Sequence, residues 1–306
     1  RAEKEDAAAA PATAEAAQPG FLGQIIKEAR WRGPESVDRG RDLIRQFLER
    51  VLERAETVSR DAQAMINARI VEIDRALSAQ LNEVLHNKEF QQLEASWRGL
   101  KYLLSQSETG TRLKIRVLNV SKQDLARDFE KAAGYDQSEL WKKVYEGEYG
   151  IFGGEPYAAM VGNYEFGRHP EDVELLEKLS TVAAAAHAPF LSAASPELLN
   201  LPSFTNLTAH RNIAEAFDGT EFAKWKSFRQ SEDSRYVALA LPHILMRLPY
   251  GRDTKKIEAF NYVEEVDGTN HGHYLWGNAA WALGARLTSA FARYGWCVAI
   301  RGVEGG

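Results

Sequence analysis

Two histidines in the second half of the chain, His271 and His273, are separated by a single glycine and could begin a metal site. Imidazole is a common zinc ligand, but a structural zinc ion takes four donors and a catalytic one takes three from the protein. The nearby carboxylates of Glu265 and Asp267 are neighbours in sequence only, so the ligand set is incomplete. We interpret the pair as surface histidines in a glycine-rich loop, and we predict neither a metal nor a cofactor.

Two charged residues, Glu155 and Arg301, border predicted buried strands, where an unpaired charge would be costly. A carboxylate with a perturbed pKa can act as a catalytic acid. An α/β enzyme with a site at the strand ends, near Glu155 and His271, is therefore the alternative function that the sequence leaves open. Structural ion pairs are commoner, and Ser195 does not lie in a nucleophile elbow. We predict that the protein is not an enzyme.

The glycine-rich run of residues 150–155 resembles a phosphate-binding loop only superficially. It lacks a following Lys-Ser/Thr pair and precedes a predicted strand instead of a helix, so no helix dipole is available to an anion. We interpret it as a tight turn. Cys297, the single cysteine, lies in the apolar run of residues 296–300, which predicts a buried small side chain and not a reactive thiol.

The overall composition gives no reason to expect a nucleic-acid or membrane partner. The net charge is -5, and no apolar run approaches the roughly twenty residues that a membrane-spanning helix needs. At 306 residues there is room for about two domains. We expect a cytoplasmic protein.

The N-terminal third of the chain predicts a tail followed by helices. Residues 1–20 contain almost no large apolar side chain and are expected to be disordered. Residues 21–33 predict a short amphipathic helix that ends at Gly33-Pro34, a form suited to binding in a partner's groove. Its predicted contact residues are Phe21, Leu22, Ile25, Ile26 and Ala29.

Residues 37–106 predict a helical arm with apolar stripes at helical spacing. So long a helical segment, with few intervening strands, favours an arm that binds partners over a compact enzyme lobe. The residues that we expect to contact a partner are Ile44, Phe47, Val51, Ile66, Ile73 and Leu77. A turn at His86-Asn87 leads to a third helix, whose apolar stripe is Phe90, Leu93, Trp97, Leu100 and Leu104.

Residues 111–306 alternate between strand and helix patterns, which predicts an α/β domain with a mostly parallel sheet flanked by helices. The predicted strands are residues 113–120, 157–162, 189–193 and 296–300. Ser121 is a predicted N-cap for a helix of residues 122–133, and Ser138 for a helix of residues 139–146. Pro170 is expected in the first turn of a helix of residues 171–187, and a further helix stops at Gly295. Because the chain would end on a core strand and a glycine-rich loop, we expect the domain to be incomplete at its C-terminus.

Three blocks of residues follow one another in order across most of residues 20–306. The first is Ile73-Asp74, Leu81-Asn82-Glu83, His86, Phe90-Gln91, Leu93-Glu94, Trp97-Arg98-Gly99-Leu100 and Tyr102-Leu103. The second is Phe152-Gly153-Gly154-Glu155-Pro156-Tyr157 with Gly162. The third is Tyr274-Leu275-Trp276-Gly277-Asn278, Gly295-Trp296-Cys297 and Ile300-Arg301-Gly302. Together they resemble the large subunit of the bacterial type VI secretion contractile sheath, the TssC/VipB family.

The resemblance implies a sheath-type fold and a structural role. It implies that the chain pairs with the small sheath subunit (TssB/VipA) and stacks with further copies of itself around the inner tube (Hcp), on a baseplate. It also implies that an AAA+ unfoldase (ClpV) grasps the N-terminal helix to recycle contracted sheath. The motif residues to which it assigns a structural role are Trp97, Arg98, Gly99, Gly153, Gly154, Glu155, Trp276, Asn278, Trp296, Arg301 and Gly302.

Overall fold

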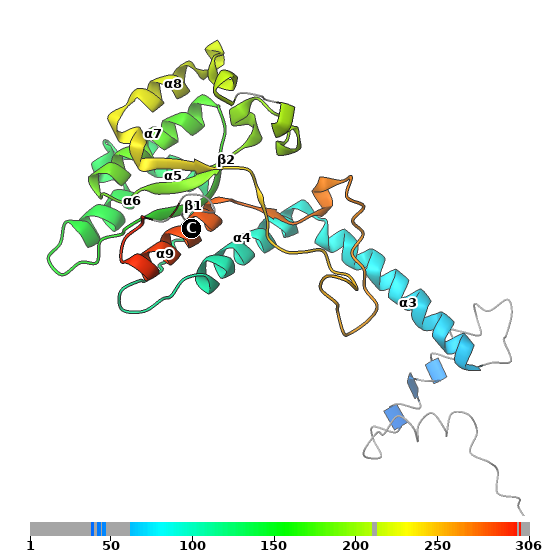
Figure 1. Ribbon diagram of the computed structural model, residues 1–306. Coiled ribbons are helices and arrows are strands. Elements are labelled where there is room, and N and C mark those ends of the chain that lie inside the picture. Colours follow the sequence, from blue (N-terminus) through cyan, green and yellow to red (C-terminus); the bar gives the residue numbers. More distant parts are fainter. Residues whose placement is uncertain are drawn as a thin grey trace, which may run out of the picture. The chain divides into compact units, whose positions relative to one another are not determined.

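The computed structural model describes residues 38–39, 42–43, 45–46, 62–209, 213–298 and 300 (Figure 1). The chain divides into two units, Arg1–Ala76 and Leu77–Gly306. Helix α3, Ala62–Leu85, runs through the boundary between them. None of the helices in the described ranges is long and apolar enough to cross a membrane.

A parallel sheet forms the centre of the second unit, as the sequence predicts for an α/β fold. Its strands are β1 (Met160–Phe166), β2 (Phe190–Ala194) and β3 (Val237–Ala240), in the order β1-β2-β3. β2 begins and ends one residue later than the predicted strand of residues 189–193. β1 begins three residues later than predicted. The sequence analysis missed β3, because its four residues are too few to show a clear period.

Helices cover both faces of this sheet (Figure 1). α7 (Pro170–Ala185) and α8 (Ala223–Gln230) lie on one side, and α4 (Lys88–Ser105) and α9 (Ala280–Tyr294) lie on the other. α5 (Lys122–Lys131) packs against α7 and against α6 (Glu139–Trp141). A short antiparallel pair, β4 (Ile244–Leu245) and β5 (Trp276–Gly277), closes a long connection. The remaining short elements are a π-helix at Lys142–Tyr149 and 3-10 turns at Tyr135–Gln137, Pro196–Leu199, Phe204–Ala209, Ile213–Phe217, Thr220–Phe222, Glu232–Tyr236 and His271–His273.

Local capping residues set most of these helix ends. The side chain of Ser121 accepts a hydrogen bond from the backbone N–H of Asp124 at the start of α5, and Ser138 does the same for Trp141 in α6. Pro170 occupies the first turn of α7, where its missing N–H costs nothing. Gly295 ends α9 with a φ of 75°, a left-handed conformation that glycine adopts without strain. All four features were predicted.

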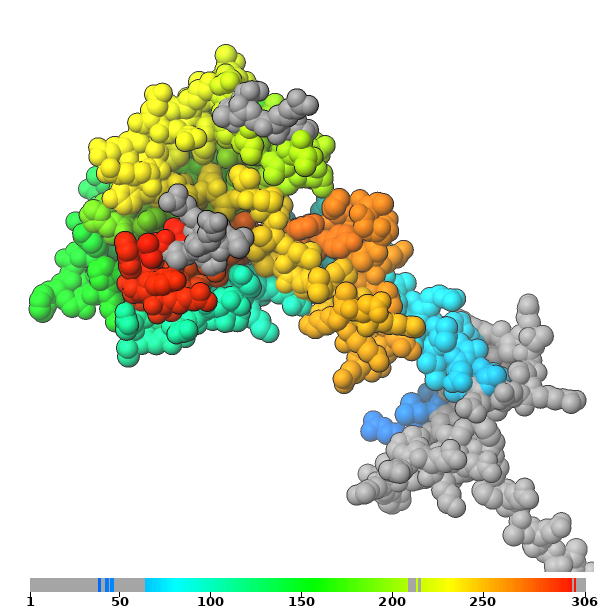
Figure 2. Space-filling model, in the orientation of Figure 1, coloured from blue at the N-terminus to red at the C-terminus, as the bar shows by residue number. Residues whose placement is uncertain are grey.

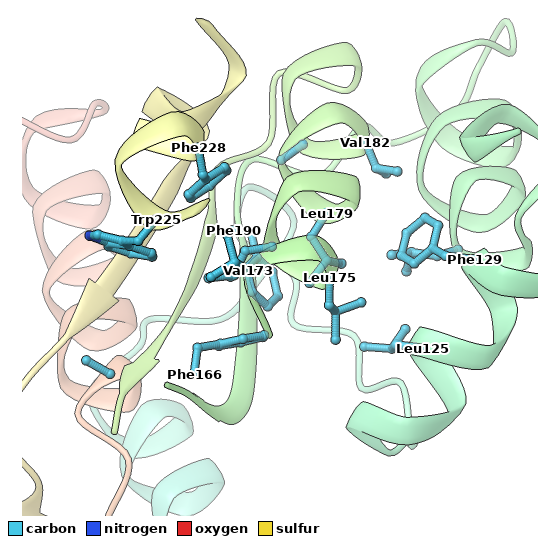
Figure 3. Packing of buried hydrophobic residues seen from close by; sticks show 14 of the residues in the cluster. Leu125, Phe129, Phe166, Val173, Leu175, Leu179, Val182, Phe190, Trp225 and Phe228 are labelled. Carbon is cyan, nitrogen blue, oxygen red and sulfur yellow. The ribbon is translucent and has the colours of Figure 1, made fainter. Parts of the chain in front are cut away.

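The main core lies between the sheet and the helices α5, α6, α7 and α8 (Figure 3). Phe166 of β1 and Leu176 and Val182 of α7 are completely buried there. A smaller cluster forms on the opposite face of the sheet, where Leu103 of α4 packs against Trp281 and Ala285 of α9. Both faces of the sheet are therefore covered, which explains why all five residues of β2 are buried.

Two predicted strands are wrong. Residues 113–120 form no strand, and within the described part of the chain the backbone groups of residues 114–119 make no hydrogen bond. Trp296 and Val298 are 65% and 51% exposed and belong to no strand, and Cys297 is exposed and not buried. Alternation and apolarity describe what a strand would bury, but a strand also needs a hydrogen-bonding neighbour, and neither segment has one among the described residues.

Candidate functional site

The two residues of the possible enzyme site, Glu155 and His271, contact different neighbouring residues. The carboxylate of Glu155 forms ion pairs with Lys114 and with Arg116, whose Nη2 lies 2.9 Å from Oε2. The hydrogen bond from Lys114 is the main cause that lowers the pKa of Glu155, so this half-exposed carboxylate stays ionised. His271 instead lies in the turn before β5, where its carbonyl accepts a hydrogen bond from the indole of Trp276 at 2.8 Å. These contacts do not build a catalytic acid.

The carboxyl ends of the parallel strands are where α/β folds usually bind ligands. Charged groups do gather there. Lys122 lies 2.6 Å from a carboxylate oxygen of Asp172, and His243 lies 2.7 Å from a carboxylate oxygen of Glu165. These four side chains are therefore engaged in pairs with each other. Within the described ranges, no cluster of three His, Cys, Asp or Glu side chains could hold a metal ion.

The apolar residues of α3 instead form an exposed surface. Ile73 and Leu77 are 47% and 46% exposed, and Ile70 beside them is 48% exposed. Ile66 is half-buried. An apolar helical stripe that the described part of the chain leaves uncovered is typical of a surface that binds a protein partner. Three other predicted contacts, Ile44, Phe47 and Val51, lie outside the described residues.

Helix α4 is apolar on two faces. Its inner face carries Ala95, Gly99 and Leu103, which are buried. Its outer face carries Leu93 and Trp97, which are 57% and 66% exposed. Figure 2 shows that α4, in teal, lies at the surface beside α9, in red.

The sequence analysis gave this helix one apolar stripe of large side chains and did not identify its buried face. The packing is decided by Gly99: a Cβ there would lie less than 3.0 Å from the ring of Trp281. The absence of a side chain at Gly99 therefore makes the space in which α9 packs. The outer stripe, with Trp97 at its centre, is left free for other contacts.

Several motif residues hold the second unit together. Asn278 is buried, donates to the carbonyl of Tyr164 at 2.8 Å and accepts from the backbone N–H of Ala280 at 2.8 Å, so it ties β1 to the start of α9. Arg98 pairs with Glu94 at 2.7 Å on α4.

The other motif residues lie at the surface or outside the description. Gly153 has a φ of 82° in an exposed turn, and an added Cβ at Gly154 would meet the carbonyl of Glu148. Trp276 is 39% exposed and Trp296 is 65% exposed. The residues that lie outside the described ranges are Phe21, Leu22, Ile25, Ile26, Ala29, Arg301 and Gly302.

A buried charge cluster was missed by the sequence analysis. Arg247 and Glu264 are 8% and 3% exposed and pair with each other, and Arg247 also binds Glu94 at 3.0 Å. No sequence pattern links these residues, because they come from α4 and from two points of the long connection between β4 and β5. In the sequence, only the apolar residues next to them indicated that these charges would be buried.

The chain matches known proteins over most of its length. A family model described as VipB, "EvpB/VC_A0108, tail sheath N-terminal domain", matches residues 67–306. The chain is 45% identical over 288 residues to the type VI secretion system sheath protein TssC1 of Pseudomonas aeruginosa (strain PAO1). That match covers 94% of this chain and 57% of the relative, so the chain spans little more than half of the length of the curated relative.

Proposed function

The chain belongs to the VipB tail sheath family of type VI secretion systems, and on this basis we propose that it is the large, structural subunit of the contractile sheath and not an enzyme. The observation that carries the proposal is the exposed apolar surface of α3, since a protein whose work is assembly needs such a surface. The pairing of Lys122 with Asp172 and of His243 with Glu165 at the strand ends favours the same conclusion over the enzyme alternative.

We propose that the helical arm of residues 37–106 binds the small sheath subunit, TssB/VipA, and that the resulting pair stacks with further copies around the inner tube, Hcp, on a baseplate in the cytoplasm. Contraction requires subunits that keep rigid cores while they shift against their neighbours. The α/β body of residues 111–306, with a covered parallel sheet, suits the rigid part. The exposed stripes of α3 and α4 suit contacts that can be exchanged.

Replacing Ile73 and Leu77 together by aspartate should abolish co-purification of the small sheath subunit, because two charges in an apolar contact are costly to bury. Pull-down after co-expression measures the effect. The matched control is Ala68→Asp with Ala79→Asp, which adds the same two charges at exposed positions on another side of α3. Full retention of the partner by the Ile73 and Leu77 variant would rule out this surface.

We also propose that residues 21–33 are the handle of the AAA+ unfoldase ClpV, with Phe21, Leu22, Ile25, Ile26 and Ala29 as contacts. Leu22→Asp with Ile25→Asp should abolish binding of the unfoldase's N-terminal domain, measured by fluorescence anisotropy. The far-ultraviolet circular dichroism of the variant should remain that of the parent chain. Gln24→Asp adds a charge between these positions and should bind as the parent does. Unchanged binding of the double variant would remove the handle hypothesis.

A further inference from the structure

Residues 246–275 connect β4 to β5 and contain only one short 3-10 turn, His271–His273. The antiparallel pair of Ile244 with Gly277 and Leu245 with Trp276 closes the two ends of this connection. A loop of this length without regular structure inside a folded unit is usually functional or disordered. This one is fixed to α3 and α4 by buried polar side chains, which indicates a defined role.

The first fixed point is a buried ion cluster. Nη1 and Nη2 of Arg247 lie 2.5 Å and 3.0 Å from the two carboxylate oxygens of Glu264, and Nε lies 3.0 Å from Glu94 on α4. The guanidinium also lies 4.6 Å from the ring centre of Tyr250. Burial alone would disfavour both charges, but the hydrogen bonds between them raise the pKa of Arg247 and lower that of Glu264. Removing one member would leave an unpaired buried charge, which is costly.

The second fixed point is the turn between α3 and α4. The hydroxyl of Tyr262 donates to Asn82 of α3 at 2.6 Å, and burial raises the pKa of Tyr262 to about 12, so it remains a donor. Gln91 of α4 donates to the carbonyl of Gly272 at 3.0 Å. The connection therefore holds the last turns of α3 and the first turns of α4 at the same time.

Two stacked imidazole rings lie at this turn between α3 and α4. The rings of His86, in the turn, and His273, in the connection, are 4.2 Å apart and almost parallel. Nε2 of His86 is buried and has no hydrogen-bond partner in the described part of the chain, and it lies 3.5 Å from Glu264. The titratable and charged groups that act on His86 are His273, Glu264 and Arg247, all from the connection.

We propose that residues 246–275 form a strap that locks the turn between α3 and α4, and that acid loosens the strap through the stacked histidines. Protonation of both rings would place two like charges 4.2 Å apart, near the charge of Arg247. Glu264 offsets part of this repulsion, but its oxygens already accept both hydrogen bonds from Arg247.

The direction of the pH effect follows from the environment of His86. Burial is the main cause that lowers the pKa of His86 from 6.5, and the nearby His273 lowers it further. The locked state therefore binds fewer protons than an open state in which His86 is solvated. The stability of the locked state relative to the open state is therefore greatest above pH 6.5. It falls as the pH drops through the range below that value.

The lock is tested by hydrogen–deuterium exchange on the 306-residue chain, with α7 as the internal reference. In Arg247→Met, amides of residues 246–275 and of residues 82–92 should exchange faster together, by roughly 100-fold or more, while α7 stays protected. Faster exchange in the connection with an unchanged turn would overturn the lock. If the amides of α7 also exchange faster in this variant, Tyr262→Phe is the second test, because it removes only the hydrogen bond to Asn82. Amide exchange in residues 246–275 and in residues 82–92 should again rise together. A rise in one segment without the other would overturn the proposal.

The acid response is tested in the same measurement at pH 7.5 and pH 5.5, after correction for intrinsic exchange rates. Exchange of both segments in the parent chain should rise by at least about threefold at the lower pH. His273→Phe keeps a stacked ring but removes one ionisable group, so this response should shrink. His271→Phe is the matched control outside the stack and should respond as the parent does. A parent chain without a pH response, or a His273 variant with the full response, would overturn the release by acid.

Discussion

Replacing Phe166 by alanine should lower the free energy of unfolding of the Leu77–Gly306 unit by about 3–5 kcal/mol. Phe166 has no exposed surface, and its ring makes edge contacts with Phe190 and Tyr164 at centroid distances of 6.1 Å and 6.5 Å. Lys122 lies 4.5 Å from the ring centre. The substitution would therefore remove apolar burial, leave a cavity and disturb a cation–π contact. Urea denaturation followed by circular dichroism measures the loss.

The matched control is Phe152→Ala. Phe152 lies in the exposed turn before β1 and is fully exposed, so its removal should change the free energy of unfolding by no more than about 0.5 kcal/mol. Equal effects at the two positions would show that the core between the sheet and α7 does not carry the stability of this unit.

Replacing Gly99 by valine should cost roughly 2–3 kcal/mol, near the upper end of the range for overpacking. A Cβ at this position would meet Nε1, Cδ1 and Cε2 of the Trp281 ring at less than 3.0 Å, and the rigid indole cannot move aside as a flexible side chain could. The helix propensity of valine is slightly better than that of glycine, by a few tenths of a kcal/mol, so the steric cost decides the sign. Denaturation in urea measures the difference.

Two further variants separate the clash from other effects. Gly110→Val places the same side chain where the structure offers open space, and it should be nearly neutral. Adding Trp281→Leu to Gly99→Val should recover part of the loss, since residues in contact are not additive. A double variant that is no better than the sum of the single variants would show that Gly99 does not act by making space for Trp281.

The sequence predicted the local features of the fold well because they depend on near neighbours. The caps at Ser121 and Ser138 and the stop at Gly295 are hydrogen bonds or backbone conformations within a few residues. The bounds of α7 and β2 were predicted to within about two residues for the same reason. The family resemblance is confirmed, because blocks of matching residues in a fixed order need no knowledge of packing.

The candidate site was predicted only in part. Ile73 and Leu77 are exposed, and their contact with a partner stays a prediction. The buried face of α4 was not identified, because a pattern of large residues cannot show that Gly99 makes room for Trp281. The strand at residues 113–120 was predicted from alternation, which says nothing about whether a neighbouring strand is present.

The sequence by itself determined the α/β class, the ends of most helices and the sheath family, since these rest on composition, periodicity and short-range contacts. The tertiary structure decided which faces are buried and which charges meet. Arg247, Glu264 and Glu94 approach one another only after β4 and β5 pair and the connection folds onto α4. Contacts between residues far apart in the chain depend on the arrangement of whole elements, and no local pattern encodes that arrangement.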